Sequence, residues 1–140
     1  MKTSIYAVAI IEENNKFLII KNKASGSMNS EVWQFPGGEL TDGEEPEEGL
    51  IRNINEKLDM DISVLDIFKV VFEGNDKKQA FKLVYLCLRD FGEPRKHECD
   101  DFVWLTLDEL RSGKYDFTAA DKKIINKISI FSGCGPSLYS

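Results

Sequence analysis

Residues 37–60, GGELTDGEEPEEGLIRNINEKLDM, decide the fold that we expect for this chain. They contain two glycines, an acidic loop and an amphipathic helix that begins near Pro46. Apolar residues recur at spacings of three and four along this helix, which places them on one face: Leu50, Ile51, Ile54 and Leu58. Polar side chains fall on another side: Glu48, Arg52, Asn53 and Glu56. The stretch therefore predicts a loop that leads into a helix with one core-facing side.

The start of this helix carries several features that favour it. Pro46 suits the first turn, where its missing N–H group has no partner to lose. The flanking acidic residues suit the positive end of the helix dipole: Glu44, Glu45, Glu47 and Glu48. A loop that ends in carboxylates, before a helix with a further carboxylate and an arginine, is suited to hold a hard divalent cation.

The spacing resembles the Nudix box, the signature of the Nudix hydrolases. That signature is a glycine, five residues, a glutamate, seven residues, Arg-Glu, an aliphatic, any residue, Glu-Glu, any residue, a glycine and an aliphatic. The matching positions are Gly38, Glu44, Arg52, Ile54, Glu56 and Met60. Residues 33–38, WQFPGG, also resemble the segment that usually precedes the box. The resemblance implies the Nudix fold over nearly the whole chain, an α/β/α sandwich in which helices flank a mixed β-sheet.

Three positions depart from the box. Asn53 and Lys57 stand where the family has glutamates, and Asp59 replaces the box glycine. Nudix enzymes hold Mg²⁺ with these glutamates and activate water against a pyrophosphate. A glutamate-to-lysine change beside a doubly charged ion shifts the interaction by roughly 4 kcal/mol, or about a thousandfold in metal affinity. The departures therefore weaken the catalytic assignment and leave the fold assignment intact.

Three interpretations of Asn53 and Lys57 remain open. Hydrolysis has been lost, or the metal is held differently, through Glu56, Glu44 and a backbone oxygen such as that of Gly37. In the third interpretation, Lys57 acts as a cation beside a phosphate and takes over part of the metal's charge.

The resemblance gives roles to several other residues. Glu56 keeps the position of a metal ligand, although a solvated helix glutamate is the ordinary alternative. Glu44 and Arg52 are expected to form an ion pair that holds the loop onto the helix. Many relatives complete the metal site with an acidic residue ahead of a tryptophan. We assign this role to Glu98 rather than Asp101, and a merely solvated acidic loop is the competing interpretation.

Two further residues are candidates for substrate binding. Asp121 lies where some relatives read the edge of a nucleobase, and a carboxylate accepts hydrogen bonds from an amino group. The alternative, which we favour, is that Asp121 completes a capping box begun at Thr118. Phe35 could stack on a base, but aromatic residues at such positions are more often part of the core.

The remaining sequence predicts one mixed α/β domain over residues 1–131 and a flexible tail over residues 132–140. Strands are expected at residues 5–11, 17–20, 31–35, 62–72, 79–88 and 102–105, with short helices after Thr106 and Thr118. Residues 22–30 form a polar loop that could lie over the mouth of the site, and a plain connector is the equal alternative.

The composition indicates which partners and which cell compartment to expect. The net charge of −6 argues against nonspecific binding to nucleic acid. Apolar runs of membrane-spanning length and a signal peptide are both lacking in this sequence. The cysteines show no disulfide or zinc spacing, and His97, the one histidine, lacks a partner at metal-ligand spacing. A reducing cytoplasm is the expected compartment.

The leading hypothesis is a Nudix pyrophosphohydrolase that uses Mg²⁺, or Mn²⁺, on a nucleoside diphosphate linked to another group. Among relatives, ADP-ribose enzymes typically carry a proline, and dinucleoside polyphosphate enzymes a tyrosine, about 16 residues beyond the box. This chain has Asn75 and Asp76 in that region, which favours nucleoside triphosphates and the MutT-like branch. The alternatives are a nucleotide-binding or regulatory module without hydrolysis, and an interaction domain with a vestigial cleft. Nudix proteins often pair, so the resemblance also allows a homodimer.

Overall fold

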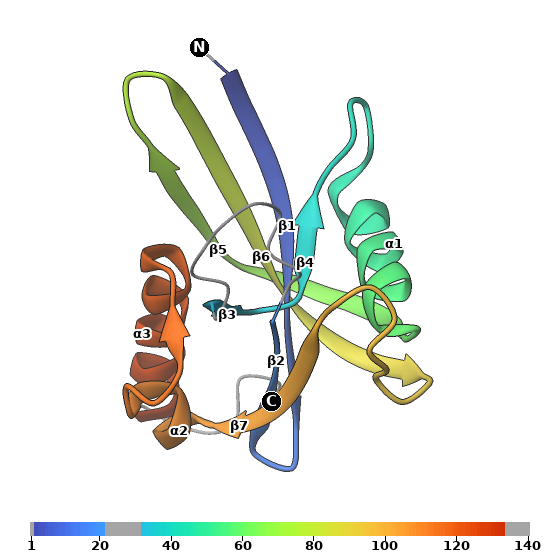
Figure 1. The fold of residues 1–140 in the computed structure, drawn as a ribbon, viewed down its shortest axis with the longest axis vertical. Coiled ribbons are helices and arrows are strands. Elements are labelled where there is room, and N and C mark those ends of the chain that lie inside the picture. Colours follow the sequence, from blue (N-terminus) through green and yellow to red (C-terminus); the bar gives the residue numbers. More distant parts are fainter. Residues whose placement is uncertain (1, 22–31, 134–140) are drawn as a thin grey trace.

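A mixed β-sheet separates two helical layers in the computed structural model, which describes residues 2–21 and 32–133. The helix α1 (Pro46–Leu58) covers one side, and α2 (Leu107–Arg111) and α3 (Ala119–Gly133) cover the other (Figure 1). The strands are β1 (Lys2–Glu13), β2 (Lys16–Lys21), β3 (Val32–Gln34), β4 (Gly37–Glu39), β5 (Asp61–Gly74), β6 (Lys78–Phe91), β7 (Asp101–Thr106) and β8 (Asp116–Phe117). This arrangement is the predicted α/β/α sandwich.

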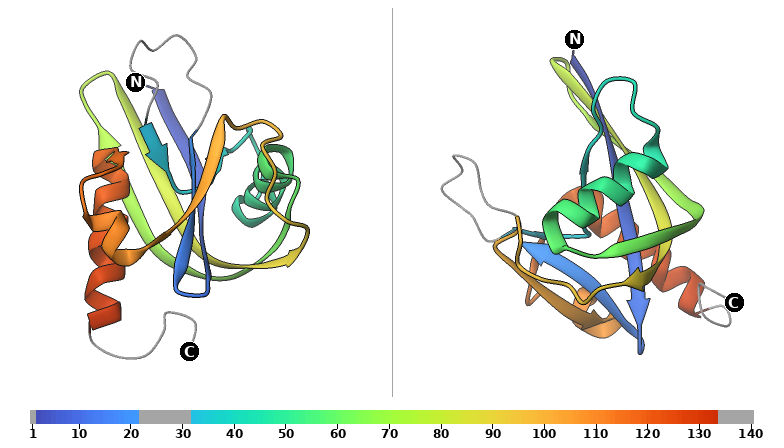
Figure 2. Two further views of the ribbon diagram at one scale, coloured as in Figure 1. Left: turned by 60° about the horizontal axis from the view of Figure 1, so that its bottom comes forward. Right: turned by 90° about the vertical axis from the view of Figure 1, so that its right-hand side faces the viewer.

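Strand β1 organises both cores, because its side chains alternate between the two faces of the sheet. Ala7, Ala9 and Ile11 pack into the cluster that includes α1. Val8 and Ile10 point the other way and pack with α2 and α3. The buried residues of α1 that close the first core are Leu50, Ile54 and Leu58. One strand therefore fixes the position of the helices on both sides (Figure 2).

The pairing of β1 determines which segments meet at its middle. Along one edge β1 runs parallel to β6, with Tyr6 opposite Lys82. Along the other edge it pairs antiparallel with β4, and Val8 lies opposite Gly37. After Glu13 the chain turns into β2 through Asn14 and Asn15, which both have positive φ. The glycines of the motif therefore lie directly beside the centre of the sheet.

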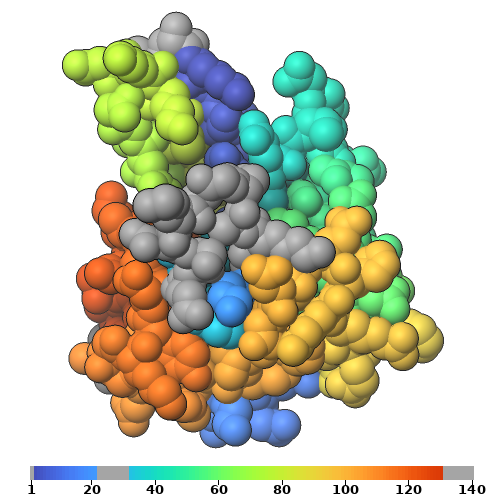
Figure 3. All heavy atoms as spheres, in the orientation of Figure 1, coloured from blue at the N-terminus to red at the C-terminus, as the bar shows by residue number. Residues whose placement is uncertain are grey.

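Two elements project beside β1 at one end of the molecule. The β5–β6 hairpin lies on one side, and the acidic loop before α1 lies on the other (Figure 3). Strands were expected at residues 62–72 and 79–88, and their antiparallel pairing extends from Asp61↔Phe91 to Gly74↔Gln79. Within the described residues, no helix is both long and apolar enough to span a membrane.

Several details differ from the sequence expectations. Residues 37–38, which lie outside the expected strands, belong to the strand β4, and β8 was not predicted either. Ile51, expected on the buried face, is 37% exposed, whereas Asn53, expected on the polar side, is only 6% exposed. Helix α3 runs past residue 131, where we placed the domain end, to Gly133. The loop expected over the site, residues 22–30, and the end of the expected tail lie outside the described residues.

Candidate functional site

The acidic loop is fastened to α1 by a two-pronged ion pair. Arg52 Nε lies 2.7 Å from Glu44 Oε2, and Arg52 Nη2 lies 2.9 Å from Glu44 Oε1. The backbone N–H of Thr41 also donates to Glu44 Oε1, at 3.0 Å. Hydrogen bonds from Arg52 and Thr41 lower the pKa of Glu44 to about 2. The predicted pair is present, and these contacts use both carboxylate oxygens of Glu44.

Glu56, expected as a metal ligand, is also paired with Arg52. Arg52 Nη1 lies 3.1 Å from Glu56 Oε2 and 3.3 Å from Oε1. The Glu56 side chain is 47% exposed, so water competes for the same carboxylate. Arg52 thus holds Glu44 with one part of its guanidinium group and Glu56 with another.

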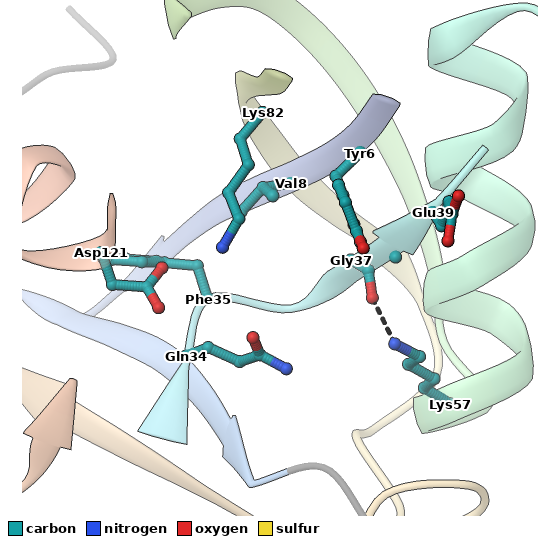
Figure 4. A pocket seen from close by; sticks show the side chains of 10 residues that line it. Tyr6, Val8, Gln34, Phe35, Gly37, Glu39, Lys57, Lys82 and Asp121 are labelled. Atoms are coloured by element: carbon teal, nitrogen blue, oxygen red, sulfur yellow. Dashed lines mark hydrogen bonds between the residues drawn. The ribbon is translucent and has the colours of Figure 1, made fainter. Parts of the chain in front are cut away.

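Lys57 reaches from the last turn of α1 to the backbone of β4. Its ammonium group donates a hydrogen bond to the carbonyl oxygen of Gly37 (Figure 4). The side chain is half-buried, and burial lowers the pKa of Lys57, an effect that the charges of Cys99, Glu56 and Glu98 oppose. A lysine ammonium therefore lies on the backbone oxygen that we expected to bind a metal.

Asn53 lies beneath the glycines of the motif. Its Nδ2 donates to the backbone oxygen of Gly49 at 3.1 Å, one turn earlier in α1. Its side-chain oxygen lies 2.5 Å from where a Cβ on Gly38 would be, so Gly38 admits no side chain beside it. Asn53 thus acts as a packing residue between α1 and β4, with its amide turned away from solvent.

Gly37 is required by the same close packing. Its φ is +155°, and a Cβ there would lie 2.1 Å from the carbonyl oxygen of Ala7. The backbone N–H of Ala9 donates to Pro36 O at 2.8 Å, which fixes the chain just before β4. The backbone of β4 therefore approaches β1 at a point where only glycine fits.

The segment of residues 92–100 caps the C-terminal end of α1. The backbone N–H groups of His97 and Glu98 donate to Lys57 O at 3.2 and 3.0 Å, and Arg95 N donates to Leu58 O at 2.9 Å. His97 Nδ1 lies 2.7 Å from Glu56 O. These contacts satisfy carbonyls that a helix leaves unpaired at its end. They also bring Glu98, which we expected near the box residues, to the turn that carries Lys57.

The residues at the box positions do not fit the metal centre that the resemblance implies. In the described ranges, residues 2–21 and 32–133, no three His, Cys, Asp or Glu side chains gather to hold a metal ion. Asn53 and Lys57 supply an amide and an ammonium in place of carboxylates, and an ammonium has no lone pair for a metal. The oxygen of Gly37 is already bound to Lys57.

A pocket of about 150 Å³ opens beside Lys57, between β1, β4, β6 and the N-terminal end of α3 (Figure 4). Its lining combines two lysines, aromatic rings, an amide and carboxylates: Tyr6, Val8, Gln34, Phe35, Gly37, Gly38, Glu39, Lys57, Lys82 and Asp121. The structure thus brings together four of the predicted residues: Phe35, Gly37, Lys57 and Asp121. Glu44, Glu56 and Glu98 are not among the residues that line it.

Asp121 lies both at the start of helix α3, beside Thr118, and in the lining of the pocket. Thr118 Oγ1 accepts from the backbone N–H of Asp121 at 3.2 Å, which is the first half of the expected capping box, but the Asp121 carboxylate accepts from the Thr118 hydroxyl at 2.8 Å rather than from a backbone N–H of Thr118. The side chain also lines the pocket while being only 1% exposed. Burial raises the pKa of Asp121, and the charge of Lys82, the Thr118 hydroxyl and the backbone N–H of Phe35 act in the opposite direction.

Sequence reasoning missed Tyr6, Gln34 and Lys82. Lys82 Nζ lies 3.4 Å from Glu73 Oε1 and 5.9 Å from the centre of the Tyr6 ring. Tyr6 and Lys82 meet because β1 and β6 are parallel neighbours, and a register between strands so far apart has no local sequence signal. Phe35, by contrast, is buried in the core and touches the pocket from there, as the core interpretation expected.

Comparison with known proteins identifies the family. The model of the NUDIX domain family matches residues 1–128. The chain belongs to the NUDIX domain family. An 8-oxo-dGTP diphosphatase of Escherichia coli K12 is 29% identical over 129 residues, which cover 91% of this chain and 98% of the relative.

Two solved structures show the same fold. The solution structure of the E. coli ORF135 protein has a TM-score of 0.83 at 23% identity and covers 97% of this chain and 95% of its own. A MutT NUDIX hydrolase from Burkholderia pseudomallei has a TM-score of 0.79 at 24% identity, over 91% of this chain and 98% of its own. The chain is thus a MutT-like Nudix hydrolase, of a class that acts on a diphosphate linkage.

Proposed function

We propose that this Nudix protein hydrolyses a nucleoside triphosphate that binds in the pocket beside Lys57. The observation that supports this is the distribution of charge in the pocket. Lys57 and Lys82 supply positive charge, whereas Asp121 enters from the N-terminal end of α3 (Figure 4). Phosphate oxygens suit the lysines, and the carboxylate of Asp121 can accept a hydrogen bond from an exocyclic amino group of a base.

The relative's substrate narrows the choice of nucleotide. The E. coli protein that is 29% identical to this chain is named for 8-oxo-dGTP. We therefore propose an oxidised or ordinary purine deoxynucleoside triphosphate as the first substrate to test. Phe35 would contact the base from the core side of the pocket, and Gln34 adds an amide that can both donate and accept.

The catalytic roles that we propose follow the box. Glu44 and Arg52 hold the acidic loop and the helix together through their ion pair. Glu56 and Glu98 are the carboxylates next to Lys57 that act on its charge, so either of them is a candidate general base. Neither lines the pocket itself, so a base there would act through a water molecule.

Only the resemblance to the Nudix family suggests that the reaction uses a divalent ion, Mg²⁺ or Mn²⁺. The ligands that we proposed are Gly37 O, Glu56 and Glu98, but Lys57 holds Gly37 O and Arg52 holds Glu56. We therefore treat metal dependence as a result to be measured. The cytoplasm is the proposed compartment, and the free thiols of Cys87 and Cys99 agree with a reducing one.

A second candidate function is a nucleotide-binding module without hydrolysis. The buried amide of Asn53 and the ammonium of Lys57 favour it, since neither group can activate water as the family's glutamates do. The third hypothesis, a vestigial cleft, predicts no nucleotide binding at all. Binding and turnover must therefore be measured separately.

The test is release of pyrophosphate and phosphate from 8-oxo-dGTP, the four deoxynucleoside triphosphates and CTP. Each reaction is run with Mg²⁺, with Mn²⁺ and with EDTA. Turnover that Glu56→Gln removes, and that the exposed-site control Glu48→Gln keeps, would support the hydrolase. Binding of a triphosphate without turnover would favour the binding module, and the lack of both would refute the proposal.

A further inference from the structure

The Lys57 ammonium group is held at a defined place beside the pocket. Its hydrogen bond to Gly37 O joins the last turn of α1 to β4, and β4 is in turn paired with β1. Gly37 cannot move away easily, because its α-carbon is packed against the backbone of Ala7 and Val8. An ammonium carries three protons. One proton goes to Gly37, which leaves two for a ligand in the pocket that Lys57 lines.

A divalent ion and this ammonium group cannot share Gly37 O. Two positive groups about 4 Å apart repel each other, and a metal ligand atom must be free of a competing cation. Asn53, which stands where the family has a glutamate, is turned into the protein and bonded to Gly49 O, and Glu56 is paired with Arg52. Metal binding at the family's position would thus require Lys57 to leave its partner.

We propose that Lys57, with Lys82, takes the place of the metal, so that the phosphate groups of a nucleotide bind in this pocket without a divalent ion. The inference rests on the proposed nucleotide site, but it does not require that the bound nucleotide is hydrolysed. A lysine ammonium is a compact point charge that binds phosphate oxygens well.

Lys82 supplies the second charge from the opposite side of the pocket. It extends from β6 across β1, with Tyr6 beside it (Figure 4). Its ion pair with Glu73 is long, at 3.4 Å, so it retains protons that can face a ligand. Glu56 and Glu98, the carboxylates near Lys57, lie outside the pocket lining; the carboxylates that do line it are Glu39 and Asp121.

The test is calorimetric binding of inorganic tripolyphosphate to the whole chain, first in EDTA and then with Mg²⁺. This probe has no base and is read without turnover. We expect binding in EDTA that Mg²⁺ does not strengthen. Lys57→Gln keeps a donor for Gly37 O but loses the charge, and it should weaken binding by about tenfold or more. Lys82→Gln should weaken it as well, whereas the exposed control Lys123→Gln should not.

Three results would overturn the inference: binding only with Mg²⁺, an unchanged affinity in Lys57→Gln, or no binding of tripolyphosphate in any condition. A circular dichroism melt of each variant shows that a loss of binding is not a loss of folding. Failure of the hydrolase proposal gives a different pattern, namely metal-free tripolyphosphate binding with no nucleotide turnover. Turnover that requires a metal, with no binding in EDTA, would instead remove this inference and keep the enzyme.

Discussion

The side-chain oxygen of Asn53 and the α-carbon of Gly38 are packed so closely that a Cβ on Gly38 would lie 2.5 Å from that oxygen. Both residues belong to the Nudix box, one on α1 and one on β4. The contact shows that the box has a packing role here in addition to any chemistry. It also couples the two positions energetically, since neither can change size without affecting the other.

This contact predicts strong non-additivity. Gly38→Ala should destabilise the protein by about 1–3 kcal/mol, because the new methyl group overpacks against Asn53. In an Asn53→Ala background the same change should cost much less, since the opposing amide is gone. Urea unfolding of the two single variants and the double variant measures the coupling. Equal costs of Gly38→Ala in both backgrounds would contradict the packing role.

The Glu44–Arg52 pair predicts a stability that depends on pH. The pKa of Glu44 in the folded protein is about 2, below the usual value of 4.5. A lowered carboxyl pKa means that the charged form is stabilised by folding. This stabilisation is fully present above about pH 4.5 and is lost as the pH falls toward 2.

Glu44→Gln should therefore be less stable than the native chain at pH 7, and the difference should shrink steadily below pH 4.5. Urea unfolding at several pH values down to the acid limit of the native state measures it. Glu48→Gln, in the exposed first turn of the same helix, serves as the control, with an expected effect within about 0.5 kcal/mol. A difference between Glu44→Gln and the native chain that grows on acidification would contradict the assignment.

The carboxyl group of Asp121 should make stability depend on pH in the opposite direction. Burial raises its pKa, so the folded protein favours the protonated form of this carboxyl. Its contribution to stability is present at low pH and is lost as the pH rises through the folded pKa. Asp121→Asn keeps an oxygen for Thr118 and Phe35 and removes the buried charge. We expect this variant to gain stability relative to the native chain as the pH rises above 3.8, the usual pKa of an aspartate.

The same unfolding series tests this second pH dependence. Asp116→Asn, at an exposed position just before the helix, should show no comparable gain. A native chain that is more stable than Asp121→Asn at high pH would mean that the Asp121 carboxylate is stabilised by its surroundings. Lys82, whose charge lowers the pKa of Asp121, would be the first residue to examine in that case.

Local spacing was sufficient for the fold and for part of the site. The three- and four-residue repeat placed Leu50, Ile54 and Leu58 on the core side of α1, and the box spacing paired Glu44 with Arg52. These contacts depend on residues close in sequence, whose geometry a helix or a short loop determines.

Long-range pairing produced the parts that could not be foreseen. Tyr6 and Lys82 meet only through the parallel register of β1 and β6, for which the sequence has no local signal. Asn53 was grouped with the polar side of the helix from its spacing, but it packs beneath β4 and is only 6% exposed. The hydrogen bond of Lys57 to Gly37 likewise depends on how β4 lies against α1.

Restoring the two box glutamates should show which position controls metal affinity and which controls packing stability. Lys57→Glu releases Gly37 O and reverses a charge, so it should raise Mn²⁺ affinity the most, by up to about a thousandfold. Asn53→Glu alone inserts a longer, charged side chain against Gly38, and we expect it to cost about 1–3 kcal/mol of stability. In the double variant, added Mn²⁺ should restore part of the lost stability, because a bound metal stabilises the folded state.

Mn²⁺ titration by calorimetry, with unfolding measured in the presence and absence of the ion, tests this prediction. Metal binding by Lys57→Glu, but not by Lys57→Gln, would show that the carboxylate and not merely the loss of the ammonium forms the site. If the double variant binds no Mn²⁺, the backbone of β4 and α1 no longer has the geometry of a metal centre. The native lysine would then be one part of a wider rearrangement of the Nudix box, rather than the single change that separates this chain from a metal site.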